Sequence, residues 1–285
     1  MTTVVTGATG HLGRLIIEAL LERGVDAESI VGTGRSIEKA ADLAARGVRI
    51  AAADYTDAAS LDAAFDGATT LVLVSSSEVG QRAVQHQAAI DAAVRAGVER
   101  IIYTSVLAAD SSPLILAPEH KATEEALLAS GLAITVLRNG WYTENYAQTV
   151  AQALATGAIV TSAGEGRVSS ALRAEYAEAA AVVASTDGHE GAVYELSGDT
   201  AWSFDEFAAA LATASGTAVT VTHLDPAAHV AALTKAGLDE GTAGFVVALD
   251  GDICAGLLDA TTGDLARLMG RPTATLEAGV RALLS

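Results

Sequence analysis

The chain has 285 residues, of which 51% are hydrophobic and only 4 are proline, so it is a folded globular protein and neither a disordered nor a collagen-like chain. Asp and Glu number 35 against 17 Lys and Arg, which gives a formal net charge of −18. Most of such a surface repels nucleic acid and anionic lipid. We therefore expect neither a nucleic-acid partner nor a membrane partner.

Cysteine content and the N-terminal residues indicate a compartment. The single cysteine, Cys254, excludes an intrachain disulfide and a cysteine-based metal site, and we expect no metal. Met1 leads directly into an apolar strand without a charged leader, and no apolar run reaches membrane-spanning length. These features predict a soluble, cytoplasmic protein.

The first informative motif is a glycine-rich turn between a strand over residues 3–6 and a helix that begins near residue 12. In a turn of this kind the first glycine allows the sharp bend, the second leaves room for a pyrophosphate, and the third lets the helix approach the sheet. Backbone N–H groups and the positive end of the helix dipole then face the phosphates. The motif predicts a dinucleotide cradle formed by Gly7, Ala8, Thr9, Gly10, His11, Leu12 and Gly13.

The elements that follow alternate between strand and helix. Further strands are expected over residues 29–33, 48–53, 70–74, 100–104 and 133–137, and helices over residues 12–20, 37–45, 60–65, 85–96 and 119–129. Six strands separated by helices predict an α/β fold with a doubly wound parallel sheet of the Rossmann type.

After Asn139 this rhythm ends. Helices are expected over residues 146–155, 174–184, 204–214, 226–236 and 276–284, with isolated strands near residues 159–161, 193–196 and 219–222. We interpret residues 1–138 as the dinucleotide-binding domain and residues 139–285 as mainly a smaller lobe, some segments of which can return to the main domain. This lobe is expected to cap the carboxyl ends of the strands, where ligands bind in open α/β sheets.

The end of the second strand indicates which nicotinamide cofactor binds. NAD-binding units carry an acidic residue there that holds the ribose 2′-hydroxyl. This chain has Arg35 instead, with Lys39 close behind, and no carboxylate before Glu38. Because a guanidinium pairs well with phosphate, the position favours NADPH. Asp54 and Tyr55, after the third strand, suit the adenine side.

Seven segments spread over the whole chain carry a family resemblance: residues 7–13, 75–82, 103–105, 138–146, 173–176, 188–199 and 270–273. They resemble the type 2 NAD(P)H:quinone oxidoreductases. These are atypical short-chain dehydrogenases of the NmrA-like group, close to the triphenylmethane dye reductases.

The resemblance implies where NADPH lies. Beyond Gly7, Ala8, Thr9, Gly10, His11 and Leu12, it implies contacts with Arg35, Ser75, Ser76, Ser77, Asn139, Gly140, Trp141, Tyr142 and Arg173. The nicotinamide would lie under residues 138–146, beside the substrate cleft. Trp141 and Tyr142 offer a flat apolar wall for an aromatic acceptor, or alternatively pack within the small lobe.

The catalytic residues depart from the ordinary short-chain dehydrogenase pattern, Tyr-x-x-x-Lys, in which a phenol donates a proton to the nascent alkoxide. Lys121 stands at the lysine position, but Ala117 replaces the tyrosine. Simple ketones would lack their usual acid, whereas a quinone accepts hydride to give a delocalised hydroquinone anion. We place Lys121, Tyr142 and Asn145 in the catalytic site, and His86 and Tyr146 as further polar groups of the pocket. Lys121 and His86 read equally well as exposed helical residues.

Hydride transfer from NADPH to quinones or related electron-poor, dye-like acceptors is therefore the predicted activity. A homodimer is one expected form. Two alternatives stay open at this point: a regulatory protein that senses NADP(H) without turnover, and a carbonyl reductase, against which Ala117 argues. His120 and Glu124 share a helical face, where pairing is a simpler interpretation than metal binding.

Overall fold

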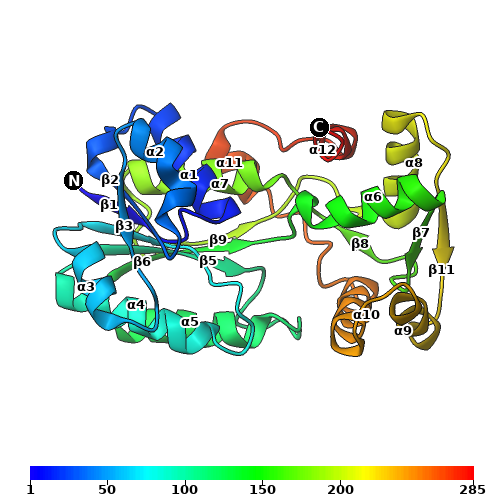
Figure 1. Cartoon of the computed structure of the whole chain (residues 1–285), viewed down its shortest axis with the longest axis horizontal. Coiled ribbons are helices and arrows are strands. Elements are labelled where there is room, and N and C mark those ends of the chain that lie inside the picture. The colour runs from blue at the N-terminus through cyan, green and yellow to red at the C-terminus, as the bar shows by residue number, and fades with distance from the viewer.

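The computed structural model describes residues 1–285 and contains one large parallel sheet with helices on both faces, followed by a smaller lobe (Figure 1). The sheet has the strand order β3-β2-β1-β4-β5-β6-β9, and all its neighbours pair in parallel. Its strands are β1 (Thr3–Val5), β2 (Ile30–Gly34), β3 (Arg49–Ala52), β4 (Thr70–Leu73), β5 (Arg100–Val106), β6 (Ala133–Asn139) and β9 (Val193–Leu196). This is the predicted doubly wound Rossmann architecture.

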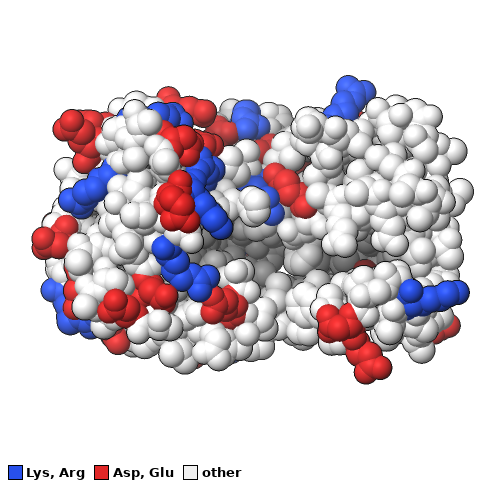
Figure 2. All heavy atoms as spheres, viewed as in Figure 1, with Lys and Arg blue, Asp and Glu red and all other residues white.

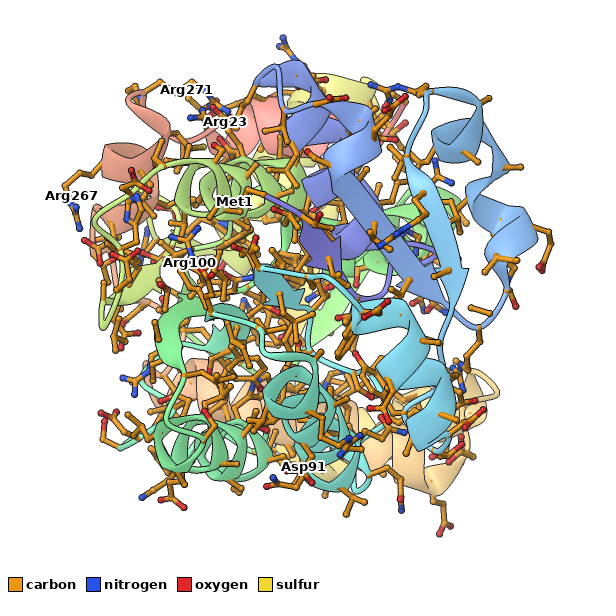
Figure 3. The ribbon with its side chains drawn as sticks, turned by 90° about the vertical axis from the view of Figure 1, so that its left-hand side faces the viewer. Met1, Arg23, Asp91, Arg100, Arg267 and Arg271 are labelled. Carbon is orange, nitrogen blue, oxygen red and sulfur yellow. The ribbon has the colours of Figure 1, made fainter.

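Helices cover the two faces of this sheet in separate groups (Figures 1 and 3). One group contains α1 (His11–Glu22), α2 (Ala41–Ala45), α7 (Arg173–Ser185) and α11 (Asp264–Met269). The other contains α3 (Ala58–Phe65), α4 (Arg82–Ala96) and α5 (Ala117–Ala129). In the end-on view Arg23 and Arg271 lie at the top with the first group, and Asp91 lies at the bottom with the second (Figure 3).

Alternation along the central strands divides the buried side chains between two cores. Val5 and Val72 belong to the core under α1 and α7, whereas Val4 and Leu71 belong to the core under α3, α4 and α5. Successive strand residues point to opposite faces. A strand buried on both faces therefore reads as a continuous apolar run, as residues 70–74 do.

The smaller lobe has its own apolar core, which contains Tyr146, Trp202, Phe204 and Phe207 with ring centroids 4.9–5.8 Å apart. Its strands form two short pairs, β7 with β11 and β8 with β10. Its elements are β7 (Ala158–Thr161), β8 (Arg167–Val168), β10 (Trp202–Ser203), β11 (Thr220–His223), α6 (Ala147–Thr156), α8 (Phe204–Ser215), α9 (Pro226–Lys235), α10 (Glu240–Cys254) and α12 (Leu276–Ala282).

The predicted strand count was wrong: the main sheet has seven strands, not six. Residues 193–196, expected as an isolated strand, form β9 and pair with β6 from Val136↔Val193 to Asn139↔Leu196. The βαβ signal is hidden because residues of the small lobe intervene between β6 and α7. The helices α10 and α11 and the strands β8 and β10 were also not predicted. No helix combines the length and apolar character needed to cross a membrane.

Candidate active site

A pocket of about 340 Å³ opens at the carboxyl ends of the central strands, where the strand order reverses between β1 and β4. Ligands of doubly wound sheets bind at this switch point. The loops that follow β1, β2, β3 and β4 form its walls. The lining includes Gly7, Thr9, Gly10, His11, Leu12, Gly13, Gly34, Arg35, Asp54, Tyr55, Ser75, Ser76, Ser77, Glu78 and Gln85. Figure 2 shows the molecular surface hollowed between the main lobe and the small lobe, with charged side chains gathered on the main lobe.

The glycine turn has the geometry of a phosphate cradle. Gly7 has a φ of +67°, a conformation that favours glycine. A Cβ on Gly13 would lie 2.3 Å from the carbonyl oxygen of Gly7, so only glycine lets α1 approach the strand end this closely. Gly10 is the N-cap of α1 and provides no side-chain cap, which leaves the first N–H groups of the helix open to a ligand.

The cradle and its surroundings fit a dinucleotide. A Cβ on Gly10 would come within 3.3 Å of the Gly7 carbonyl oxygen, and glycine leaves this part of the turn without a side chain. Ala8, by contrast, is fully buried, and its N–H donates to the carbonyl of Thr33, which ties the turn to β2. Of the predicted cradle residues, all but Ala8 therefore line the pocket.

Arg35 lies at the end of the pocket formed by the loop after β2. Its side chain is 69% exposed, and its Nη1 lies 3.1 Å from Glu78 Oε1 in the loop after β4. Asp54 lies nearby and accepts hydrogen bonds from the backbone N–H and the hydroxyl of Thr56. These bonds, with a smaller contribution from Arg35, hold the pKa of Asp54 below its usual value.

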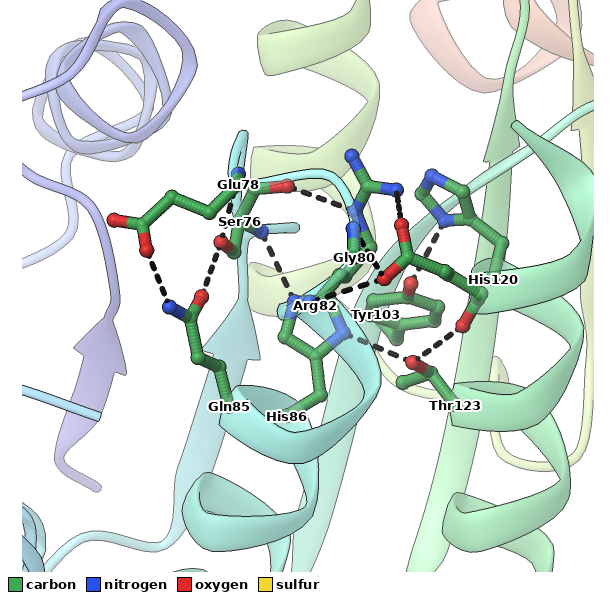
Figure 4. A network of polar contacts seen from close by, with 10 residues as sticks. Ser76, Glu78, Gly80, Arg82, Gln85, His86, Tyr103, His120 and Thr123 are labelled. Carbon is green, nitrogen blue, oxygen red and sulfur yellow. Dashed lines mark hydrogen bonds and ion pairs between the residues drawn. The ribbon is translucent and has the colours of Figure 1, made fainter. Parts of the chain in front are cut away.

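The serine loop after β4 is held by a network of buried polar groups (Figure 4). The backbone N–H of Ser76 donates to Nε2 of His86 at 2.9 Å, and Arg82 Nε donates to the carbonyl of Ser76 at 2.8 Å. Gln85 accepts from the Ser76 hydroxyl and donates to Glu78 at 2.7 Å. α4 thus fixes a loop that lines the pocket.

His86 is fully buried, so it is neither a group that lines the pocket nor an exposed helical residue. Because its Nε2 accepts from Ser76, its Nδ1 carries the proton and donates to Thr123, whose hydroxyl donates to the carbonyl of Glu119. Burial, with a smaller contribution from the charge of Arg82, lowers the pKa of His86 to about 3. The ring is a neutral structural support of the serine loop.

His120 is similarly buried and contacts the hydroxyl of Tyr103 at 2.8 Å through Nδ1. Burial, followed by the charge of Arg82, lowers its pKa to about 3. Glu124 contacts Arg138 and Ser105 instead of His120. No group of three or more His, Cys, Asp or Glu side chains is arranged to hold a metal ion.

A second cluster of predicted residues follows β6, outside the pocket described above. Asn139 is buried; its Nδ2 donates to the Tyr142 hydroxyl at 3.1 Å, while its Oδ1 has no hydrogen-bond partner. The guanidinium of Arg173 lies 5.0 Å above the ring of Tyr142. An unpaired buried acceptor is costly unless a ligand donates to it. Asn139 therefore suits a ligand that carries an N–H group.

Gly140 and Trp141 connect this cluster to the sheet and the small lobe. The Gly140 N–H donates to Leu196 in β9 at 2.7 Å, and a Cβ on Gly140 would lie 2.9 Å from that same carbonyl oxygen. Trp141 is half-buried, packs against the small-lobe core, and has an indole N–H without a partner.

Arg138 anchors the same segment through three ion pairs, of which the pair with Glu124 is buried. Its Nη2 lies 2.7 Å from Glu124, and its Nη1 lies 2.8 Å from Glu195 and 3.1 Å from Asp110. Although burial opposes the charge, the hydrogen bonds to Glu124 and Glu195 raise the pKa of Arg138. The guanidinium thereby joins β6 to α5 and β9 directly before Asn139.

Neither Lys121 nor Asn145 lines the pocket. Lys121 is exposed on α5, one turn after the buried Ala117, and Asn145 is exposed in the 3₁₀ turn Thr143–Tyr146. Tyr146 is buried in the small-lobe core, where burial raises its pKa. The catalytic assignments of Lys121, Tyr142 and Asn145 stay predictions. Glu78 and Gln85 were not predicted as site residues, although Glu78 lies in the segment 75–82 that carried the family resemblance and Gln85 follows closely after it.

Comparisons with known proteins agree with this geometry. Residues 1–183 match the NmrA-like family. Quinone oxidoreductase 2 of Escherichia coli K12 is 48% identical over 281 residues, which cover 99% of this chain and 98% of that protein. The crystal structure of the E. coli NADPH-dependent quinone oxidoreductase in complex with NADPH matches with a TM-score of 0.95 and 47% identity over 100% of both chains.

A dye-reducing enzyme is also similar. The structure of Citrobacter sp. triphenylmethane reductase complexed with NADP(H) matches with a TM-score of 0.91 and 36% identity, covering 99% of this chain and 100% of that one. These matches confirm the family resemblance read from the sequence. The chain belongs to the NmrA-like family.

Proposed function

We propose that this protein is an NADPH-dependent oxidoreductase that transfers hydride to quinones or related electron-poor acceptors. The observation that carries the proposal is the pocket at the β1/β4 switch point, with a glycine cradle at one end and Arg35 at the other. The match over the full chain to a quinone oxidoreductase crystallised with NADPH supports the same activity.

Different residues would bind different parts of the cofactor. Gly7, Thr9, Gly10, His11 and Leu12 would hold the pyrophosphate, and Arg35 the 2′-phosphate, with Ser75, Ser76 and Ser77 along the wall. Asn139, Gly140, Trp141, Tyr142 and Arg173 would surround the nicotinamide end, where Asn139 Oδ1 offers the unpaired acceptor. When bound, NADPH supplies the hydride that reduces the acceptor.

The class of hydride acceptor follows from the absence of the catalytic tyrosine that protonates the alkoxide in short-chain dehydrogenases. Ala117 is buried where short-chain dehydrogenases place a tyrosine, and Lys121 is exposed. Tyr142 is the phenol beside Asn139, but burial raises its pKa and makes it a weaker acid. A quinone needs little acid assistance, because the hydroquinone anion is delocalised and water can protonate it. Triphenylmethane dyes and similar cations also need no proton at the accepting carbon.

Purified protein should oxidise NADPH with small benzoquinones and reduce simple aliphatic ketones poorly, without added flavin or metal. Stopped-flow absorbance of NADPH across a panel of both acceptors tests this. Efficient ketone reduction with inert quinones would identify a carbonyl reductase. Tight NADPH binding without turnover of any electrophilic acceptor would favour a sensor of NADP(H).

The division of labour between lobes is part of the proposal. Residues 1–138 would bind most of the cofactor, and residues 139–285 would mainly cap the acceptor, with α7, β9 and α11 packed in the main lobe. We also propose a cytoplasmic location, in keeping with the single free cysteine, Cys254, and a homodimer. Light scattering and cell fractionation test these two points.

A further inference from the structure

The contact between Arg35 and Glu78 spans the pocket that the proposed function assigns to NADPH. Arg35 follows β2 and Glu78 follows β4, on either side of β1, and both residues line the pocket. Their side chains meet at 3.1 Å. The ion pair therefore joins two walls of the pocket at the end where a 2′-phosphate would bind.

Hydrogen bonds with Gln85 and Ser76 hold Glu78 in this position. Its Oε2 accepts from Gln85 Nε2 at 2.7 Å, and its backbone N–H donates to the Ser76 hydroxyl at 3.2 Å. Gln85 in turn accepts from Ser76 and is 8% exposed on α4 (Figure 4). The carboxylate is thus fixed beside the guanidinium instead of moving freely on the surface.

From this arrangement we infer that Glu78 determines cofactor specificity by competing with the 2′-phosphate of NADPH for Arg35. The inference rests on the proposed binding of NADPH. The Glu78 carboxylate and the 2′-phosphate would pair with the same guanidinium. A carboxylate fixed near the phosphate also repels the phosphate. NADH lacks the 2′-phosphate and leaves the Arg35–Glu78 pair undisturbed. Glu78 therefore limits the preference for NADPH that Arg35 creates.

The ion pair between Arg35 and Glu78 can be broken at a small energetic cost. Arg35 is 69% exposed and Glu78 is 41% exposed, and exposed ion pairs contribute little to stability. A phosphate carries more charge than a carboxylate and pairs well with the planar guanidinium. The 2′-phosphate can therefore displace Glu78, at a cost in NADPH affinity that NADH does not bear.

Asp54 is the other carboxylate of the pocket near Arg35, but its geometry differs. Its Oδ1 accepts from the N–H and hydroxyl of Thr56, each at 2.8 Å, and it forms no ion pair within 4.0 Å. The charge of Asp54 is therefore stabilised by Thr56 in its own turn. Glu78 is the carboxylate in direct contact with the cation.

The test measures dissociation constants of NADPH and NADH by nicotinamide fluorescence for wild type, Glu78→Gln and the control Glu125→Gln. Glu125 is exposed on α5 outside the pocket, so its variant removes one charge without touching Arg35. Glu78→Gln should bind NADPH about two- to fivefold more tightly, the range of one partly exposed charge contact, with NADH changed by less than about twofold. Glu125→Gln should match wild type. Thermal melting of each variant checks that the fold is retained.

A double-mutant comparison assigns the effect to Arg35. In an Arg35→Ala background, Glu78→Gln should no longer improve NADPH binding. A gain of undiminished size there would overturn competition for Arg35. Unchanged or weaker NADPH binding in the single variant, with wild-type binding intact, would overturn the role of Glu78 alone. If the wild type fails to bind NADPH, the proposed function and this inference both fall.

Discussion

Acidification should destabilise the protein through two buried histidines, His86 and His120. The pKa values of His86 and His120 are lowered to about 3, chiefly by burial. In the unfolded chain the pKa of each histidine is about 6.5. Between these values the unfolded state binds more protons than the folded state, so stability is fully present above about pH 6.5 and is lost as the pH falls.

The size of the effect follows from these pKa values. From about pH 7 to about pH 5, each histidine contributes a loss of roughly 2 kcal/mol in the free energy of unfolding, since only the unfolded state becomes protonated. His86 and His120 together would remove about 4 kcal/mol, a large share of the stability of an ordinary domain. Carboxylates such as Asp54, whose pKa lies below its usual value, titrate at lower pH and leave this window to the histidines.

Urea unfolding followed by circular dichroism at several pH values between about 5 and 7.5 measures this loss. In His86→Gln the amide can still accept from the Ser76 N–H, but the side chain has no proton to gain. The variant should lose about 2 kcal/mol less than wild type over the same interval. The exposed His11, replaced by Gln, is the control and should behave as wild type. An equal pH dependence in wild type and His86→Gln would refute the assignment of His86 as a buried neutral group.

Four further outcomes are expected. Gly10→Val should abolish NADPH binding while the circular dichroism spectrum stays that of a folded protein, because the backbone angles of Gly10 suit any residue but a branched side chain would lie where the pyrophosphate is expected to approach the backbone; retained affinity would show that the motif is only a turn. Gly13→Ala should instead destabilise the fold by about 1–3 kcal/mol in urea unfolding, since its Cβ would lie 2.3 Å from the Gly7 carbonyl oxygen, and unaltered stability would contradict that close packing. Trp141→Ala should reduce quinone turnover in steady-state assays more than it reduces NADPH affinity measured by fluorescence, because the half-buried indole is expected to form an apolar wall for the acceptor as well as to border the nicotinamide; equal losses would contradict the role as an acceptor wall. Asp250→Ala should cost about 3 kcal/mol in urea unfolding, because the carboxylate accepts hydrogen bonds from the hydroxyl of the buried Thr161 and from the N–H and hydroxyl of the half-buried Ser162; a loss near zero would show that the small lobe tolerates the missing acceptor.

The sequence predicted the parts of the fold that depend on local pattern. The strand, glycine turn and helix of residues 3–22 are contiguous, so their spacing alone indicates the cradle at the carboxyl end of the first strand. Arg35 could be compared with the acidic residue of NAD-binding units because it stands at a fixed distance along the same βαβ unit. Both inferences need only neighbours in the chain.

Contacts between residues far apart in the chain were harder to predict from the sequence. The strand β9 joins β6 only after the chain has left the main sheet, built α6, β7 and β8, and returned through α7. Its first residue, Val193, is 50% exposed at the sheet edge, so its apolar signal resembles that of an isolated strand. His86 was equally hard to assign, because the partners that bury it, Ser76 and Thr123, come from a different loop and a different helix.

Glu78 shows why specificity is harder to predict than cofactor class. A cation at the end of β2 predicts attraction for a 2′-phosphate, but its affinity depends on which anions already contact it. The carboxylate that contacts Arg35 lies after β4, two strands further along the chain, and the two residues meet because only β1 lies between β2 and β4 in the sheet. Reading Arg35 alone therefore overstates the preference for NADPH, and the balance between the two cofactors is set by a contact that only the folded sheet creates.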